Sequence, residues 1–198
     1  MVSGKQLSIT SDITSFISDR QLALKKSVRT VRNMFLGALD FLYGFIIQVA
    51  AMHIAKSSLG YLRPHFMAIC SPDIDCTTSA RLSDPWVGAD EYECSEMADP
   101  YRLKHARESF PSGHSASSVY VLAFLLLYVK RRRYVVKQHW VPRIVEALFI
   151  TGFAVFTIVT CVTRTTDNWH HWRDVLGGIA LGAGTAAALF WDGKRFER

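Results

Sequence analysis

The chain of 198 residues contains no internal repeat, no low-complexity tract and no Asn-x-Ser/Thr sequon, because neither Asn33 nor Asn168 fits that pattern. Its first ~30 residues are polar and hold no apolar run, so we expect no cleavable signal peptide. The net charge of +6 and the isoelectric point near 9.3 would suit a nucleic-acid-binding protein, but no recognition module is present. These absences exclude a repeat array and a nucleic-acid partner. They leave a single domain whose targeting would come from its own apolar segments.

Hydrophobic residues make up 49% of the chain, yet the mean hydropathy is only +0.13, so apolar and polar residues are segregated along it. Four apolar runs result, each of about the length that a helix needs to cross a ~30 Å hydrocarbon core. They lack the polar stripe that surface helices of a soluble bundle show. The last run is rich in Gly and Ala, which let membrane helices pack closely. The sequence therefore predicts an all-α integral membrane helical bundle with four transmembrane helices, at about 34–55, 115–129, 144–162 and 175–191.

Basic residues cluster before the first apolar run, between the second and third runs at 130–143, and after the fourth. The positive-inside rule places these three basic segments in the cytoplasm. One long loop, 56–110, then lies on the non-cytoplasmic side together with the short 163–174 connection. The predicted organisation is a polar cytoplasmic segment at 1–33, a membrane-embedded core at 34–192 and a basic cytoplasmic tail at 193–198.

Three of the four cysteines, Cys70, Cys76 and Cys94, fall in the long non-cytoplasmic loop, whereas Cys161 lies in an apolar run. Cysteines in such a loop are often paired, but three leave one over, and the sequence does not choose the pair. Their spacing is irregular, which argues against a zinc site.

Three short polar clusters lie at the ends of apolar runs, and the predicted topology places all three on the non-cytoplasmic face. In the first, AKSSLGYLRP, Lys56 and Arg63 are seven residues apart. If the first helix extends that far, the two side chains share one face, and Pro64 then ends the helix. Two cations there suit an anionic head group, although two side chains snorkelling at a helix end are an alternative.

The second cluster, Pro111-Ser112-Gly113-His114, opens the second apolar run. Gly113 permits close approach of the backbone to a ligand, and the free amides at a helix start favour a phosphate. His114 at the same point could donate a proton to a leaving oxygen. An ordinary turn with Ser112 as the helix cap is the alternative.

The third cluster, TRTTDNWHHWRD, carries Arg164, His170 and Asp174. On a helix, residues i and i+4 meet, so the Asp174 carboxylate could hold one ring nitrogen of His170 and orient the other for nucleophilic attack. His171 would then point about 100° away around the helix, which favours His170. Arg164 can form two hydrogen bonds with phosphate oxygens. The alternative is a polar helix cap flanked by tryptophans at the membrane interface, Trp169 and Trp172.

Together the clusters resemble the three-part signature of the phosphatidic acid phosphatase type 2 superfamily: Lys-x6-Arg-Pro, Pro-Ser-Gly-His and Ser-Arg-x5-His-x3-Asp. The sequences around the three clusters are similar to those of the animal lipid phosphate phosphatases; they are IAKSSLGYLRPHF, SFPSGHSASSVY and TRTTDNWHHWRDVLGG. The resemblance covers about residues 34–192. Thr163 replaces the serine of the third motif and keeps a hydroxyl group.

This resemblance implies an enzyme that hydrolyses lipid phosphates without a metal or any other cofactor. The implied substrates are phosphatidate, lysophosphatidate, sphingosine 1-phosphate and ceramide 1-phosphate. His170 would attack phosphorus to form a phosphohistidine, oriented by Asp174, and His114 would protonate the leaving alkoxide and later activate water. The implied phosphate-binding groups are Lys56, Arg63, Arg164 and the amides near Ser112 and Gly113.

The lipid phosphate phosphatases have six membrane helices, and this chain offers four. We therefore expect the two helices that would precede Met34 to be absent, as in a short isoform or an incomplete gene product. A catalytically silent subunit that modulates a six-helix relative is then an alternative function. Within the same superfamily, a sugar phosphatase, a polyprenyl diphosphate phosphatase and a vanadate haloperoxidase are further alternatives.

The expected partners are a lipid phosphate substrate and the membrane, and homo- or hetero-oligomers with related phosphatases are left open. The expected location is the plasma membrane with the active site facing outside. The endoplasmic reticulum or the Golgi apparatus, with a lumenal active site, is the alternative.

Overall fold

The computed structural model describes residues 2–73, 88, 92–135 and 140–191. Cys76, the centre of the 130–143 connection and the tail at 193–198 lie outside these residues. All regular elements within the described ranges are helices. The chain divides into two compact units, Met1–Tyr43 and Gly44–Arg198.

Helix α1 (Val2–Leu59) begins far ahead of the apolar run at 34–55. The sequence before that run contains no proline and one glycine, so nothing interrupts a helix there. The part of α1 that is apolar enough to cross a membrane extends over Phe16–Leu59. The apolar run at 34–55 therefore lies within the part of α1 that could cross a membrane, and α1 also includes most of the polar segment at 1–33.

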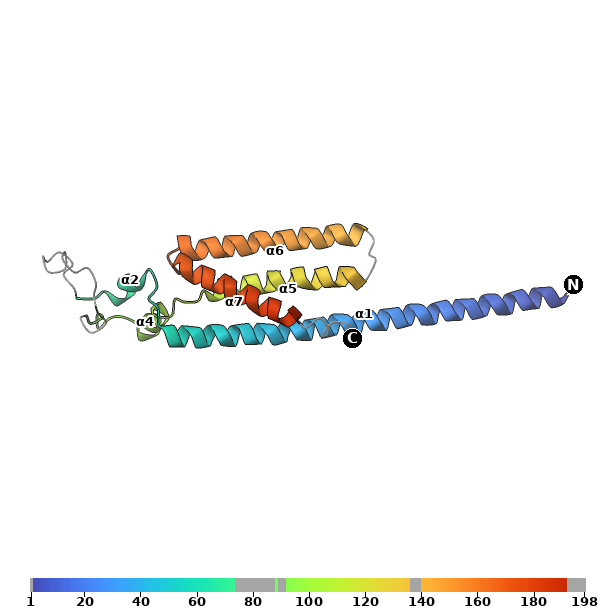
Figure 1. Ribbon diagram of the computed structural model, residues 1–198, viewed down its shortest axis with the longest axis horizontal. Helices are drawn as coiled ribbons and strands as arrows, with labels where there is room; N and C mark the ends of the chain where they lie inside the picture. Colours follow the sequence, from blue (N-terminus) through green and yellow to red (C-terminus); the bar gives the residue numbers. More distant parts are fainter. Residues whose placement is uncertain (1, 74–87, 89–91, 136–139, 192–198) are drawn as a thin grey trace. The chain divides into compact units, whose positions relative to one another are not determined.

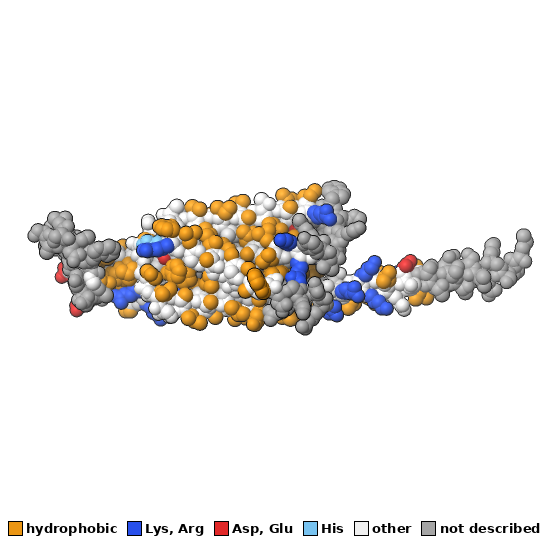
Figure 2. Space-filling model, viewed as in Figure 1, with side chains coloured by type: hydrophobic (Ala, Val, Ile, Leu, Met, Phe, Trp, Pro, Cys, Tyr) orange, Lys and Arg blue, Asp and Glu red, His pale blue; other side chains and the backbone are white. Residues whose placement is uncertain are grey.

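Four helices in the described part of the chain are long and apolar enough to cross a membrane, which confirms the predicted all-α fold. Besides α1 they are α5 (Gly113–Val135), α6 (Trp140–Thr166) and α7 (Trp172–Trp191). Hydrophobic side chains cover the flank of the bundle that these helices form in the second unit (Figure 2). Among these four helices, α6 has the most apolar span. This surface is what a helix in contact with lipid requires, and the chain is an integral membrane protein.

Helix α5 packs against both α6 and α7 (Figure 1). The close approach of α5 and α7 depends on two glycines that recur four residues apart on α7. A Cβ atom on Gly178 would lie 2.5 Å from the carbonyl oxygen of Ser112, and one on Gly182 would collide with the carbonyl oxygen of Ala116. The expectation that small residues of the fourth run allow close packing is confirmed.

The part of α1 that belongs to the second unit also packs against α5. The rings of Phe45 and Tyr120 have centroids 5.9 Å apart. Nearer the end of α1, the Ser117 hydroxyl donates a hydrogen bond to Oε1 of the buried Gln48, at 3.4 Å. These contacts bring the last turns of α1, which carry Lys56, beside the start of α5.

The long loop contains two short helices, α2 (Phe66–Cys70) and α4 (Pro100–Ala106), which pack against each other around buried Phe66, Cys70 and Ala106. A disulfide joins Cys70 to Cys94, which decides the pairing that the sequence left open. Asp99 caps α4, since its Oδ1 accepts a hydrogen bond of 3.0 Å from the Tyr101 amide. The loop thus has a small core of its own at the end of the helical bundle.

Candidate active site

The first cluster is divided between a helix and the segment that follows it. Gly60 adopts a left-handed conformation, with φ of +58°, and ends α1 at Leu59. The first helix therefore does not extend to Arg63, and the condition under which Lys56 and Arg63 would share one helix face is not met. Arg63 is positioned instead by the backbone, because its N–H donates a hydrogen bond of 2.8 Å to the carbonyl of Ala106, the last residue of α4.

The second cluster meets the first at Gly113, where α5 begins. A Cβ atom on Gly113 would lie 4.0 Å from Nζ of Lys56. Ser112 is fully buried; its N–H donates a 2.9 Å hydrogen bond to the Asp174 carbonyl, and its hydroxyl shares a 3.0 Å hydrogen bond with the Ser115 hydroxyl. The Ser112 amide thus ties α5 to α7, which argues against its use for phosphate. The amide of Gly113 is better placed for that purpose.

The third cluster forms by a different route from the one that helical spacing predicts. Helix α7 begins at Trp172, so His170 lies in the bend before it, and the expected i, i+4 pair on one helix is wrong. His170 Nδ1 nevertheless lies 3.7 Å from Asp174 Oδ2. The His170 N–H also donates a 2.9 Å hydrogen bond to the carbonyl of Arg164, which fixes the bend to the end of α6.

His171 does not point away from Asp174 as the helical argument expected. Its Nδ1 lies 3.5 Å from Asp174 Oδ2, and its backbone N–H donates a 2.9 Å hydrogen bond to the same oxygen. Burial separates the two histidines instead: the side chain of His170 is 4% exposed and that of His171 is 37% exposed.

Ser109 is a member of the site that the sequence did not single out. Its side chain is fully buried, and its hydroxyl donates a 2.5 Å hydrogen bond to Asp174 Oδ2. The same hydroxyl lies 3.4 Å from His170 Nδ1. Ser109 and the His171 amide therefore both hold the same oxygen of the Asp174 carboxylate. Its only signal in the sequence is its position two residues before Pro111.

Arg63 and Arg164 each have a buried Nε atom that donates to no acceptor among the described residues. A buried guanidinium N–H without a partner costs free energy, and an anion between the two arginines would satisfy both donors. His114, an exposed residue in the first turn of α5, lies within electrostatic range of Arg164, Lys56 and Arg63. The three clusters thus converge at one end of the bundle, where Lys56 and Arg63 are within electrostatic range of both His114 and His170.

The pKa of His170 is lowered to about 4, chiefly by burial and then by the positive charges of Arg63 and Lys56, whereas the Asp174 carboxylate raises it by a smaller amount. The His170 imidazole is therefore neutral at pH 7. With Nδ1 turned toward Asp174 and Ser109, Nε2 is the nitrogen that remains for a substrate. Burial also lowers the pKa of the Arg63 guanidinium from its usual value.

Trp169 packs against Arg63. The Arg63 guanidinium lies 5.6 Å from the centroid of the indole ring, and the His65 ring meets the same indole edge-on at 5.0 Å. His65 is fixed in turn by a 2.8 Å hydrogen bond between its Nδ1 and the Asn168 carbonyl. Trp169 and Trp172 are 46% and 68% exposed, as the predicted interfacial anchors would be.

No group of three or more His, Cys, Asp or Glu side chains in the described part of the chain is arranged to hold a metal ion. The charged groups that meet at the site are mainly cations, which suits an anionic ligand.

Residues 37–198, most of the chain, match the PAP2 superfamily. The chain is 33% identical over 187 residues to phospholipid phosphatase 1 of Rattus norvegicus, which covers 92% of this chain and 59% of that relative. It is 36% identical over 146 residues to phospholipid phosphatase 1 of Mus musculus, covering 74% and 48% of the two chains. It is 35% identical over 152 residues to phospholipid phosphatase 2 of Homo sapiens, covering 74% and 47%. The chain thus spans about half the length of the curated relatives it matches, and no solved structure matches it significantly.

Proposed function

The chain belongs to the PAP2 superfamily, and on that premise we propose that it is a membrane phosphatase that hydrolyses lipid phosphates. The matched relatives are named phospholipid phosphatases, which supports this reaction class. The proposed substrates are phosphatidate, lysophosphatidate, sphingosine 1-phosphate and ceramide 1-phosphate, each a phosphate monoester on a lipid alcohol.

The observation that carries the proposal is the pair of buried, unpartnered Nε donors of Arg63 and Arg164. Together with Lys56 and the start of α5 at Gly113, they make a site whose donors come from three helices and from the segment that follows α1. A phosphate monoester offers three equatorial oxygens to such donors, and the developing negative charge of the transition state strengthens each contact.

In the proposed first step, Nε2 of His170 attacks phosphorus and the ester P–O bond breaks. The leaving alkoxide takes a proton from the imidazolium of His114, and a phosphohistidine remains. The low pKa of His170 supports this role, because a nucleophilic imidazole must be neutral. Asp174, held by Ser109, orients the ring and stabilises the positive charge that the ring gains.

In the second step, neutral His114 takes a proton from water, whose oxygen attacks phosphorus. The P–N bond breaks, inorganic phosphate leaves, and both histidines return to their starting states. Neither step requires a metal ion, because Lys56, Arg63 and Arg164 supply the positive charge. The proposed location is the plasma membrane with the site facing outside, or an internal membrane with the site facing the lumen.

The test is phosphate release from phosphatidate by the purified protein in detergent with EDTA present. His170→Ala is expected to reduce the rate by about three orders of magnitude or more, since it removes the nucleophile. His171→Ala is the matched control and is expected to keep most of the activity, because the more exposed neighbour has no covalent role. A wild-type rate equal to that of His170→Ala contradicts the proposal. Such inactivity, together with co-purification with a six-helix relative, would favour the silent subunit.

A further inference from the structure

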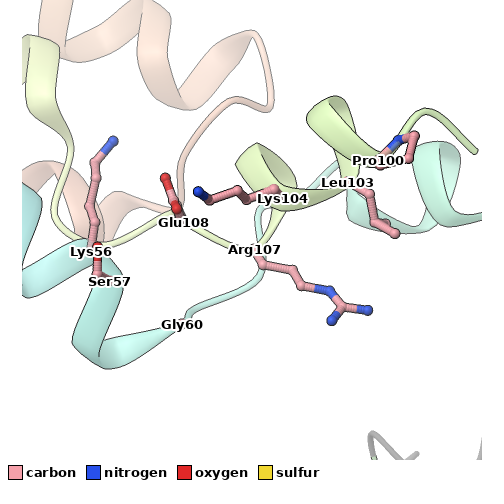
Figure 3. Close-up of a pocket in the computed structure, with 8 residues that line it drawn as sticks. All are labelled: Lys56, Ser57, Gly60, Pro100, Leu103, Lys104, Arg107 and Glu108. Carbon is pink, nitrogen blue, oxygen red and sulfur yellow. The ribbon is translucent and has the colours of Figure 1, made fainter.

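A cavity of about 400 Å³ lies beside Lys56, between the end of α1 and helix α4 (Figure 3). We name it the α1–α4 cavity. Lys56, Ser57 and Gly60 line it from α1 and the turn that follows, and α4 with Arg107 and Glu108 supplies the other wall. Lys56 thus belongs both to the proposed phosphate site and to this cavity. A substrate whose phosphate is bound at Lys56 can place neighbouring atoms in the cavity.

Glu108 gives the cavity a negative charge close to the phosphate site. Its side chain is 21% exposed, and its carboxylate interacts electrostatically with both Lys56 and Arg63. Asp174 also interacts with both cations, but its Oδ2 already accepts hydrogen bonds from Ser109 and His171. Glu108 is therefore the carboxylate that lines the cavity and is better able to receive a group of the substrate.

The basic side chains near Glu108 leave its carboxylate accessible to a ligand. The Arg107 guanidinium lies 5.7 Å from the centroid of the Phe66 ring, and in Figure 3 it is directed away from Lys56 and Glu108. Lys104 extends toward Glu108 in the same view, but it is an exposed side chain that can move into solvent. His105, which does not line the cavity, has its Nδ1 3.8 Å from the Glu108 carboxylate; this distance is too long for a hydrogen bond, and the two form an ion pair only when the histidine is protonated.

A cation and a carboxylate side by side are complementary to a ligand that carries a phosphate and an ammonium group on adjacent carbon atoms. Resting on the proposed function, we propose that the α1–α4 cavity binds the polar end of the leaving alcohol. Glu108 there selects lipid phosphates with an ammonium group next to the phosphate ester, as in a sphingoid base phosphate. Lys104 competes with that ammonium group for the carboxylate.

The test compares two substrates that share a backbone: sphingosine 1-phosphate, which carries the ammonium group, and ceramide 1-phosphate, in which it is a neutral amide. Glu108→Gln is expected to lower the ratio of their kcat/KM values about fivefold, as for a partly exposed ion pair. Hydrolysis of ceramide 1-phosphate is expected to stay the same or to rise, because a negative charge near the phosphate is removed. Lys104→Gln is expected to raise the ratio, because it removes the competing cation.

Glu96→Gln, the same change at an exposed glutamate of the loop that does not line the cavity, is the control and is expected to leave the ratio unchanged. Equal losses with both substrates in Glu108→Gln, or an unchanged ratio, overturn the inference. Equilibrium binding of the two lipids to the His170→Ala protein, with and without Glu108→Gln, decides the selectivity separately from turnover. Wild-type protein that hydrolyses neither lipid contradicts the proposed function, whereas a binding preference that Glu108→Gln does not reduce contradicts the inference alone.

Discussion

At the scale of single residues, the site is organised around one carboxylate. Asp174 is almost completely buried, and its Oδ2 accepts hydrogen bonds from the Ser109 hydroxyl and the His171 amide. His170 lies 3.7 Å away in the same buried region. A buried carboxylate with this many donors is rigid, and rigidity is what a residue that orients a nucleophile requires.

Ser109 is expected to act as a positioning residue. Ser109→Ala removes the hydroxyl that holds Asp174, and a hydrogen bond to a charged group contributes enough to predict a loss in kcat of about tenfold. KM is expected to change little, because Ser109 is not among the proposed phosphate-binding groups. Steady-state kinetics in detergent measure both quantities.

Ser118→Ala is the matched control for this change, because Ser118 is also a buried serine but donates within its own helix, to the Ser115 carbonyl at 3.2 Å. It is expected to retain kcat. A rise in KM with unchanged kcat in Ser109→Ala would contradict the positioning role.

The pH dependence follows from the lowered pKa of His170. Its pKa is about 4 rather than the usual 6.5, chiefly because of burial and then because of Arg63 and Lys56. His170, the proposed nucleophile, therefore stays neutral as the pH falls through 6.5, and the acid limb of kcat/KM is expected near pH 4 after correction for substrate ionisation. Arg63→Gln removes a positive charge and is expected to move this limb upward.

The folded state is expected to lose stability as the pH falls from 6.5 to about 4. In this interval His170 of the unfolded chain binds a proton at its ordinary pKa, whereas His170 of the folded chain does not. Recovery of activity on return to pH 7 separates titration from unfolding. An acid limb at the ordinary pKa of histidine in the wild type, unmoved by Arg63→Gln, would show that His170 is not the titrating nucleophile.

At the scale of helices, the site depends on how closely α5 and α7 approach. The Ser112 N–H donates to the Asp174 carbonyl, so the starts of the two helices are joined directly. This hydrogen bond requires the small residues on α7, because a side chain at Gly178 or Gly182 would meet the backbone of α5. The second and third clusters are therefore brought together by helix packing.

Gly182→Ala is expected to destabilise the protein by about 1–3 kcal/mol, because the added methyl group collides with the backbone of Ala116 and Tyr120 and the helices must separate. Gly184→Ala on the same helix is the control, since a Cβ atom there meets nothing within 4 Å. It is expected to be neutral or to stabilise α7 by up to about 1 kcal/mol. Unfolding in mixed micelles measures both changes, and equal stability of the two variants would contradict the packing role of Gly182.

At the scale of the whole molecule, the second unit has an apolar flank and a polar end. Hydrophobic side chains cover the flank (Figure 2), and the three polar clusters gather at the end that carries α2 and α4. The positive-inside rule predicts that this end is not cytoplasmic.

Glycosylation tests this orientation with no background, because the chain contains no sequon of its own. Glu96→Asn with Ala98→Ser creates one in the long loop, and we expect it to be glycosylated in a eukaryotic host. A sequon made in the basic connection by Gln138→Asn with Trp140→Thr is expected to remain unmodified. A shift in mass on treatment with a glycosidase reports each outcome, and modification of the second site alone would reverse the predicted topology.

The sequence by itself determined the four membrane helices and the residues of the three clusters, because hydropathy and short motifs are local properties. It predicted the proximity of His170 and Asp174 from the wrong geometry, since a bend and not a helix brings them together. Only the tertiary structure decided the Cys70–Cys94 pair, the hydrogen bond of the Ser112 amide to Asp174, and the positions of Ser109 beside Asp174 and of Glu108 in the α1–α4 cavity. Each of these depends on contacts between segments far apart in the chain, and no local pattern of side chains encodes such contacts.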